Sequence, residues 1–247
     1  MNGPLYMIQL PLGPAAFVRF LAAQGLNTNS DEDLGYGTHA WLRATFGETA
    51  PKPFRLFLSE RGHAPAKLLG YTRAGRESLL EYAHSFAEPA ALAVCDLEEQ
   101  LAVAALPGAD DWRPGRQLGF EVLVSPVARR SRDGRERDLF LHRADTAGPA
   151  AGLDREAVYV DWLAERLEGA AHLDRANLEE FQVVHHLRQG ERSAGGSRAR
   201  ARLVRPRALM RGQLTLTDGN AFAGLLAHGV GRHRAFGYGM LLLRPPR

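Results

Sequence analysis

The segment from Gly229 to Gly239, which reads GVGRHRAFGYG, combines residue types that suit the binding of phosphate groups. Glycine has no Cβ, so the backbone N–H groups of such a glycine-rich loop can approach a phosphate closely. Arginine adds positive charge, and Phe236 or Tyr238 could stack on a base. The pattern favours contact with RNA, and the structural alternative is a tight helix-to-strand turn. The residues of this predicted contact are Gly229, Gly231, Arg232, His233, Arg234, Gly237 and Gly239.

Two known phosphate-binding motifs do not fit the glycine-rich loop. It lacks the lysine and Ser/Thr pair that ends a Walker loop. It also precedes the last apolar run of the chain, Met240–Leu243, whereas a dinucleotide fingerprint follows the first strand of its unit. The sequence therefore gives no indication of a nucleotide cofactor at this position.

Arginine also gathers in the stretch that precedes the glycine-rich loop. Only Lys52 and Lys67 are lysines among the 31 basic residues, and codon use in a GC-rich genome accounts for that preference. It does not account for eight arginines between Arg188 and Arg211 with Glu191 as the only acid. A dense local excess of arginine predicts a nucleic-acid groove, and a solvated loop face is the alternative. The predicted contacts are Arg198, Arg200, Arg202, Arg205, Arg207 and Arg211, with Arg129, Arg130 and Arg132 as secondary candidates.

The histidines and acids give no metal-binding pattern. There is no HExxH motif, no cysteine pair and no cluster of carboxylates, so we expect neither a catalytic metal nor a cofactor. Cys95 is the single cysteine, which excludes an internal disulfide and indicates a small buried residue. His39, considered alone, is typical of a structural histidine on an amphipathic helix. Asp161 and Glu165 are most simply part of a solvated helix face.

The first half of the chain must position these residues with a mixture of strands and helices. The pattern predicts strands over 5–10, 52–58 and 67–72, and helices over 15–23, 30–46 and 76–86, whereas 91–105 fits either type. Residues Ser30–Asp33 resemble a capping box, and Gly47 is a good helix stop. Gly35 and Gly37 each cost a helix about 1 kcal/mol relative to alanine, so that this helix could instead begin near Thr38.

The second half repeats the pattern after a linker rich in glycine, proline and acids. We expect strands over 117–127, 177–187, 198–204, 209–217 and 238–243, helices over 154–167 and 218–227, and a charged loop over 129–137. The order β, α, β, β, α, β predicts a ferredoxin-like unit, and the first half can be interpreted in the same way. The expected fold is α+β, with two tandem ferredoxin-like domains at 1–106 and 117–247 and a linker at 107–116.

Composition places the chain among globular proteins. Of 247 residues, 45% are hydrophobic and 24% are charged, and the formal net charge is +3. No apolar run approaches the roughly 20 residues of a membrane helix, and the N-terminus lacks the features of a secretory signal. We therefore expect a cytoplasmic protein without a membrane partner.

The glycine-rich loop and the apolar run that follows it, GVGRHRAFGYGMLLL, resemble the C-terminal signature of the repeat-associated CRISPR proteins. The form is most similar to that of CasE-type repeat endoribonucleases, and REAVYVDWL at 155–163 is similar to the second-domain helix of that family. The resemblance implies metal-independent cleavage of a CRISPR repeat stem-loop. It also implies that the protein binds the mature crRNA and joins a Cascade-like effector complex. A non-catalytic RNA-binding subunit of such a complex is the alternative, and a metabolic or nucleotide-binding enzyme on the same fold is a third.

The same resemblance implies a catalytic histidine on or near the first helix, preceded by tyrosine. This sequence has Tyr36 and His39, which would share a face of a helix, and Arg43 one turn later could neutralise a phosphate. In metal-free RNA cleavage the ribose 2′-hydroxyl attacks the adjacent phosphorus, giving a 2′,3′-cyclic phosphate and a 5′-hydroxyl. Imidazole can take or give a proton near neutral pH, and a phenol can donate a hydrogen bond. Which of the two is base and which is acid stays open.

Overall fold

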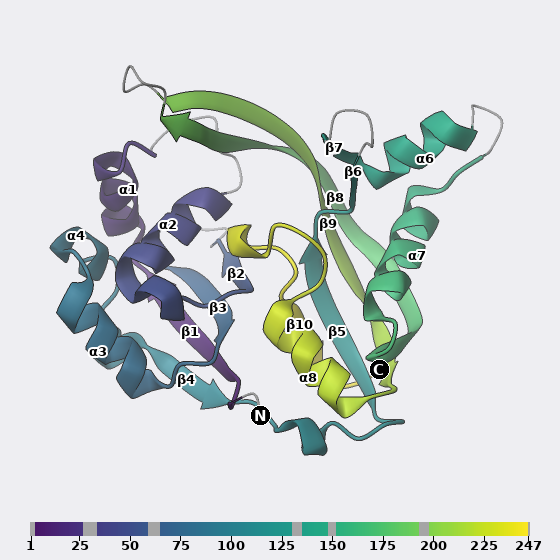
Figure 1. The fold of residues 1–247 in the computed structure, drawn as a ribbon, viewed down its shortest axis with the longest axis horizontal. Helices are drawn as coiled ribbons and strands as arrows, with labels where there is room; N and C mark the ends of the chain where they lie inside the picture. Colours follow the sequence, from purple (N-terminus) through teal and green to yellow (C-terminus); the bar gives the residue numbers. More distant parts are fainter. Residues whose placement is uncertain are drawn as a thin grey trace.

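The computed structural model describes residues 3–26, 34–58, 65–129, 135–147, 152–192 and 198–246, with the backbone alone over 186–192 and 198–203. It contains two four-stranded antiparallel sheets, one in each half of the chain (Figure 1). The first sheet has the order β2-β3-β1-β4 and the second has the order β10-β5-β9-β8. If the four strands of each sheet are numbered 1 to 4 along the chain, the first sheet has the order 2-3-1-4 and the second has the same order reversed, 4-1-3-2. This is the strand order of a ferredoxin-like fold. The predicted pair of ferredoxin-like folds is confirmed.

The first half follows the order βαββαβ with extra helical turns. Its strands are β1 (Tyr6–Leu12), β2 (Phe54–Phe57), β3 (Ala66–Thr72) and β4 (Ala102–Ala105). Its helices are α1 (Pro14–Ala23), α2 (Gly35–Phe46), α3 (Arg76–Phe86), α4 (Pro89–Leu92) and α5 (Leu97–Gln100), with a 3₁₀ turn η1 at Gly47–Thr49. The segment 91–105, which fitted either type, contains helical turns and then a strand. Trp41 is fully buried in this half.

The second half contains β5 (Gln117–Val124), α7 (Arg155–Leu167), β8 (Ala171–Arg192), β9 (Arg198–Leu216), α8 (Gly219–His228) and β10 (Leu241–Arg244). A small hairpin of β6 (Val127–Arg129) and β7 (Glu136–Asp138), followed by α6 (Leu139–Ala147), is inserted after β5. Two 3₁₀ turns, η2 (Ala109–Asp111) and η4 (Arg234–Phe236), lie in the predicted linker and in the glycine-rich loop. β8 and β9 are more than twice as long as β5, and their ribbon extends well beyond the rest of the sheet in Figure 1.

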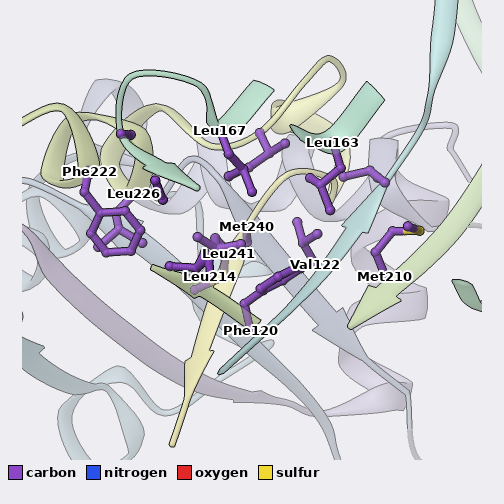
Figure 2. Packing of buried hydrophobic residues seen from close by; sticks show 14 of the residues in the cluster. Phe120, Val122, Leu163, Leu167, Met210, Leu214, Phe222, Leu226, Met240 and Leu241 are labelled. Carbon is purple, nitrogen blue, oxygen red and sulfur yellow. The ribbon is translucent and has the colours of Figure 1, made fainter. Parts of the chain in front are cut away.

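The core of the second half lies between its sheet and the helices α7 and α8 (Figure 2). Alternate residues of β5, Phe120 and Val122, point to this face, as strand geometry requires. Asp154 accepts a hydrogen bond from Ala157 N and caps α7, whose apolar stripe then packs on the sheet. Each fully buried leucine or phenylalanine stabilises the fold by about 1.5–3 kcal/mol. The other face of the sheet carries polar residues such as Glu121 and Arg211.

Several predicted boundaries are wrong. The strands expected at 198–204 and 209–217 are one strand, and the strand expected from 177 begins at Ala171. The expected loop 129–137 has strands at both ends, and the last strand begins at Leu241 instead of Tyr238. The helix α6 was not expected. α2 begins by Gly35 and not near Thr38, while the capping box at 30–33 lies outside the described residues.

The two halves are packed against each other. The Tyr71 hydroxyl on β3 donates a buried hydrogen bond to the Leu241 carbonyl on β10, with an O···O distance of 2.8 Å. The glycine-rich loop of the second half lies beside α2 of the first (Figure 1). The junction between the halves therefore brings together the two segments that the sequence singled out. Among the described helices, none combines the length and the apolar character needed to cross a bilayer.

Candidate active site

Helix α2 presents Tyr36 and His39 on one face, and both rings contact Phe236 of the glycine-rich loop. The Tyr36 and Phe236 rings are stacked with centroids 6.0 Å apart, and His39 meets Phe236 edge-on at 5.6 Å. Both side chains are half-buried. The prediction that phenol and imidazole share a helix face is confirmed, and neither ring is lost in the apolar core.

The two glycines of α2 have a packing reason. A Cβ at Gly35 would lie 2.3 Å from the carbonyl oxygen of Phe236, and one at Gly37 would lie 2.6 Å from a Leu21 methyl carbon. Glycine weakens a helix, but here it lets α2 approach the loop and α1 more closely than alanine would allow. The residues that made the start of this helix hard to predict are thus the ones that bring it to the site.

The glycine-rich loop is shaped by left-handed backbone conformations. Gly229, Gly231, Gly237 and Gly239 all have φ between 74° and 88°, a region that favours glycine. A Cβ would also lie 2.8 Å from the Trp162 ring at Gly231 and 2.4 Å from the Val230 carbonyl at Gly239. The conformation of the loop therefore accounts for its four glycines, and contact with RNA stays a prediction for it. Tyr238 is fully buried and does not present a ring to a base.

A pocket of about 910 Å³ opens beside α2, lined in part by His39 and Arg43. Lys52, Arg73 and the carboxylate of Glu48 also line it, whereas Tyr36 does not. Lys52 and Arg73 were not among the predicted site residues, and they come from the segments before β2 and after β3. Nothing in the local pattern marks either residue. They line the same pocket as His39 because the ends of β2 and β3 lie beside α2 in the folded chain.

The pKa of His39 lies below the usual 6.5, first because the ring is partly buried and then because Arg43 and Lys52 are positively charged. His39 is therefore neutral at pH 7 and able to accept a proton. Arg43 itself forms an ion pair with Glu48, and its Nη1 donates to the Gly47 carbonyl over 2.9 Å. Arg43 thus donates a hydrogen bond to a free carbonyl at the C-terminal end of α2 and also lines the pocket.

The charged residues of the glycine-rich loop have protein partners. Arg232 Nη1 donates to Glu136 Oε1 over 2.9 Å, and Arg234 Nη1 donates to the His228 carbonyl over 2.8 Å. His233 lies between Glu136 and Arg205, with Nε2 2.9 Å from Glu136 Oε2 and Nδ1 3.0 Å from Arg205 Nη1. Glu136 was part of a predicted loop, and nothing in the local residue pattern marks it as a site residue.

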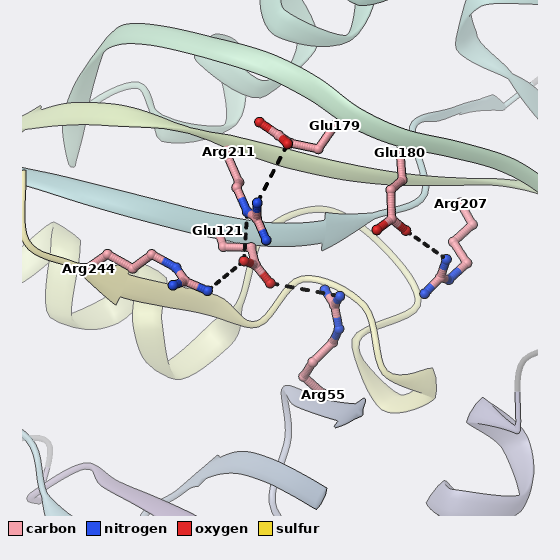
Figure 3. Close-up of polar contacts among 7 residues, drawn as sticks. All are labelled: Arg55, Glu121, Glu179, Glu180, Arg207, Arg211 and Arg244. Carbon is pink, nitrogen blue, oxygen red and sulfur yellow. Dashed lines mark hydrogen bonds and ion pairs between the residues drawn. The ribbon is translucent and has the colours of Figure 1, made fainter. Parts of the chain in front are cut away.

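Three arginines of the β8–β9 ribbon pair with carboxylates. Arg207 pairs with Glu180 at 3.7 Å, and Arg211 pairs with the buried Glu121 at 2.9 Å (Figure 3). Arg205 pairs with Glu136 at 3.2 Å. Arg198, Arg200 and Arg202 lie on β9, where the backbone alone is described. Arg129 ends β6 and is exposed, while Arg130 and Arg132 lie outside the described residues.

Metal ligands do not gather in the described part of the chain. No three side chains of His, Cys, Asp or Glu within it come close enough to hold an ion. Cys95 is buried, as expected, and burial together with Asp96 raises its pKa to about 12.

Solved structures with the same fold include the CRISPR endoribonuclease Cse3 and the CRISPR-associated protein Cas6e. Cse3 bound to a 19-nucleotide RNA has a TM-score of 0.63 and 20% identity, and the match covers 98% of this chain and 100% of that one. Thermus thermophilus Cse3, bound to an RNA representing a pre-cleavage complex, has a TM-score of 0.57 and 21% identity with the same coverage. Cas6e from Escherichia coli K-12 has a TM-score of 0.54 and 17% identity, again with the same coverage. At these identities the likeness shows the fold, and the predicted CasE-type architecture is confirmed.

No curated protein sequence matches significantly. The model of the CRISPR-associated protein family matches residues 5–245, nearly the whole chain. The chain therefore belongs to the family of CRISPR-associated proteins.

Proposed function

We propose that this protein binds CRISPR repeat RNA and cleaves it without a metal at the site formed by His39 and Tyr36. The observation that carries the proposal is the position of His39. It combines a lowered pKa with a place in the wall of a pocket that also contains Arg43 and Lys52. A proton acceptor and two cations around one cavity are what attack on a phosphodiester requires.

In the proposed reaction His39 takes the proton of the ribose 2′-hydroxyl as that oxygen attacks the adjacent phosphorus. The bond to the 5′-oxygen breaks, and the Tyr36 phenol supplies the hydrogen bond and proton for the leaving oxygen. Lys52 and Arg43 stabilise the negative charge on the phosphoryl oxygens. The products are a 2′,3′-cyclic phosphate and a 5′-hydroxyl. His39 is assigned as the base because its neutral form dominates at pH 7.

The RNA partner is proposed from the arginines and from the relatives. A duplex stem is recognised mostly through its shape and phosphates, which suits a ribbon that carries Arg205, Arg207 and Arg211. Two of the similar structures are Cse3 with RNA bound, and another is of a CRISPR RNA-guided surveillance complex in a pre-nicking state, with a TM-score of 0.53. We propose a repeat stem-loop as substrate, the mature crRNA as the retained product and a Cascade-like complex as the assembly.

Cleavage of a repeat RNA in EDTA tests the chemistry. The wild type should cut, whereas His39→Ala should cut at least about 100-fold more slowly and bind with unchanged affinity. His84→Ala is a matched control, since His84 is exposed on α3 and pairs with Glu98. Equal cutting by the wild type and His39→Ala would show that the site is wrong. Tight RNA binding with no cutting in EDTA or in Mg²⁺ would favour the non-catalytic RNA-binding subunit.

A further inference from the structure

Glu136 joins three parts of the second half that are distant in sequence. It lies on β7, and its carboxylate meets Arg232 and His233 of the glycine-rich loop and Arg205 of β9 at 2.9, 2.9 and 3.2 Å. Arg205 and His233 are largely buried, with side chains 13% and 10% exposed. The Arg205–Glu136 ion pair has limited access to water and is therefore screened less than a surface pair. The contact therefore ties the small β6–β7 hairpin to the loop.

His233 is the residue on which this contact acts most directly. It has a left-handed backbone, with φ of 62°, which costs a residue other than glycine about 1 kcal/mol or more. Burial and then the charge of Arg205 lower its pKa to about 4, against the influence of Glu136, so the ring is neutral at pH 7. A neutral ring with hydrogen on Nε2 accepts from Arg205 at Nδ1 and turns its N–H side to Glu136. The Nε2 contact with Glu136 is close but poorly directed for a hydrogen bond.

His233 in turn sets the position of Phe236. The Phe236 N–H donates to the His233 carbonyl over 2.8 Å, and the two rings are stacked with centroids 6.4 Å apart. Phe236 is the ring that packs against both Tyr36 and His39. A continuous series of contacts therefore runs from Glu136 through His233 and Phe236 to the proposed catalytic pair.

We infer that Glu136 is a positioning residue, which holds His233 and Phe236 so that Tyr36 and His39 are oriented for cleavage. The inference rests on the proposed function and adds a specific role to it. A carboxylate repels phosphate, so we do not assign Glu136 a contact with the RNA backbone. If Arg205 and Arg232 do bind RNA, Glu136 opposes that binding by neutralising them. A positioning role and a binding role therefore predict different results. If Glu136 positions the catalytic pair, removing its charge should slow cleavage without weakening RNA affinity.

The experiment compares Glu136→Gln, Phe236→Ala and the double variant in single-turnover cleavage and in RNA binding. Glu136→Gln should reduce the rate by about 10- to 100-fold, as expected when reacting groups are misplaced by about an ångström. Its dissociation constant should be equal to or lower than that of the wild type. If Glu136 acts through Phe236, the double variant should be no slower than Phe236→Ala alone, since the two changes then share one effect. Glu165→Gln removes a carboxylate of α7 that pairs with Arg143 of α6 and Arg166 of α7, and it should leave the rate unchanged.

A measurement without RNA keeps the inference independent of the cleavage assay. The ring resonances of His39 should shift in Glu136→Gln and in Phe236→Ala, because Phe236 no longer packs against the imidazole in the same way. Unchanged His39 resonances, a wild-type cleavage rate in Glu136→Gln, or a double variant whose losses multiply would each overturn the inference. If His39→Ala cuts like the wild type, the proposed function fails instead, and the resonances alone then decide the role of Glu136 in placing the ring.

Discussion

At the scale of single residues, the lowered pKa of His39 has a direct consequence for the pH dependence of cleavage. A base must be unprotonated to act, and burial and the charges of Arg43 and Lys52 all disfavour the protonated ring. The single-turnover rate should therefore rise with pH to a plateau, with a midpoint below 6.5. Rates measured between pH 4.5 and 8 on one repeat RNA would locate the midpoint. A midpoint above 6.5 would contradict the assignment of His39 as the base.

Removing one of the causes of the lowered pKa should move the midpoint in a known direction. Lys52→Met deletes a positive charge near His39, so its imidazole should be easier to protonate and the midpoint should shift toward higher pH. The plateau should also fall, because the proposed phosphate contact is lost. Lys67→Met is the control, since it changes the only other lysine and lies on β3 outside the wall of the pocket. A lower plateau with an unmoved midpoint would mean that Lys52 contacts the phosphate but does not lower the pKa of His39.

His233 should affect stability between pH 4 and 6.5. Its pKa is about 4 in the folded chain and near 6.5 when unfolded, so the unfolded chain binds more protons in this window. The free energy of unfolding should then fall as pH is lowered, by at most about 1.4 kcal/mol per pH unit from this group. His233→Asn, which tolerates the left-handed backbone, should lose less stability than the wild type between pH 7 and 5. Urea unfolding at both pH values checks this, and equal losses would contradict it.

The sequence alone is enough to predict site residues that lie close together within one helix. Tyr36 and His39 are three residues apart, so a helix and a family resemblance are enough to place them together. Lys52 and Glu136 cannot be found in this way. Glu136 meets Arg232 across 96 positions of the chain, and which residues meet depends on how the inserted hairpin folds back. Only the tertiary structure supplies that information.

At the scale of elements, the left-handed glycines of the loop should tolerate no side chain. Gly231→Ala would force φ of 74° on alanine and place its Cβ 2.8 Å from the Trp162 ring. We expect a loss of about 1–3 kcal/mol in the free energy of unfolding, measured in urea. Gly224→Ala is the matched control, because a Cβ there meets nothing within 4 Å inside α8. That variant should be more stable than the wild type, by up to about 1 kcal/mol. A stable Gly231→Ala would contradict the loop conformation.

Long, strongly patterned elements were predictable and irregular ones were not. α3 occupies the expected residues 76–86, and α7 begins at Arg155, one residue after its expected start at Asp154. The predicted strand for β8 was too short, and β9 was predicted as two strands. The ribbon that β8 and β9 form is bulged and polar and continues beyond the core, where alternation of apolar residues no longer marks a strand. The domain boundary at 107–116 stays a prediction. A domain boundary implies that each half folds independently, and the packing of the two halves against each other does not test this.

At the scale of the whole molecule, the proposed site exists only where the halves meet. α2 supplies Tyr36 and His39, and the second half supplies Phe236. A contact between β2 and β5 also crosses this junction. There Arg55 Nη2 lies 4.0 Å from Glu121 Oε1, with both side chains buried (Figure 3). A small rotation between the halves would therefore separate Phe236 from α2 and open the buried ion pair together.

Glu121 is the carboxylate of this ion pair, and it also pairs with Arg211 and Arg244 of its own half. Burial alone would raise its pKa, but the hydrogen bond from Arg211 and the charges of Arg211, Arg244 and Arg55 outweigh burial, and the pKa lies below the usual 4.5. Its stabilising effect is thus present at neutral pH and is lost as pH falls through that lowered pKa. Glu121→Gln leaves three guanidinium groups facing an uncharged amide. We expect a loss of about 3–5 kcal/mol in the free energy of unfolding at pH 7, measured in urea.

The partner arginines provide the control for Glu121→Gln. Arg244 is 51% exposed on its side chain, so that Arg244→Ala should cost no more than about 1 kcal/mol. Because the junction also holds Phe236 against α2, Glu121→Gln should slow cleavage of repeat RNA even under conditions where it is fully folded. Arg244→Ala should leave the rate close to that of the wild type. Equal destabilisation by the two variants would mean that the Glu121 network is a surface cluster and does not hold the halves together.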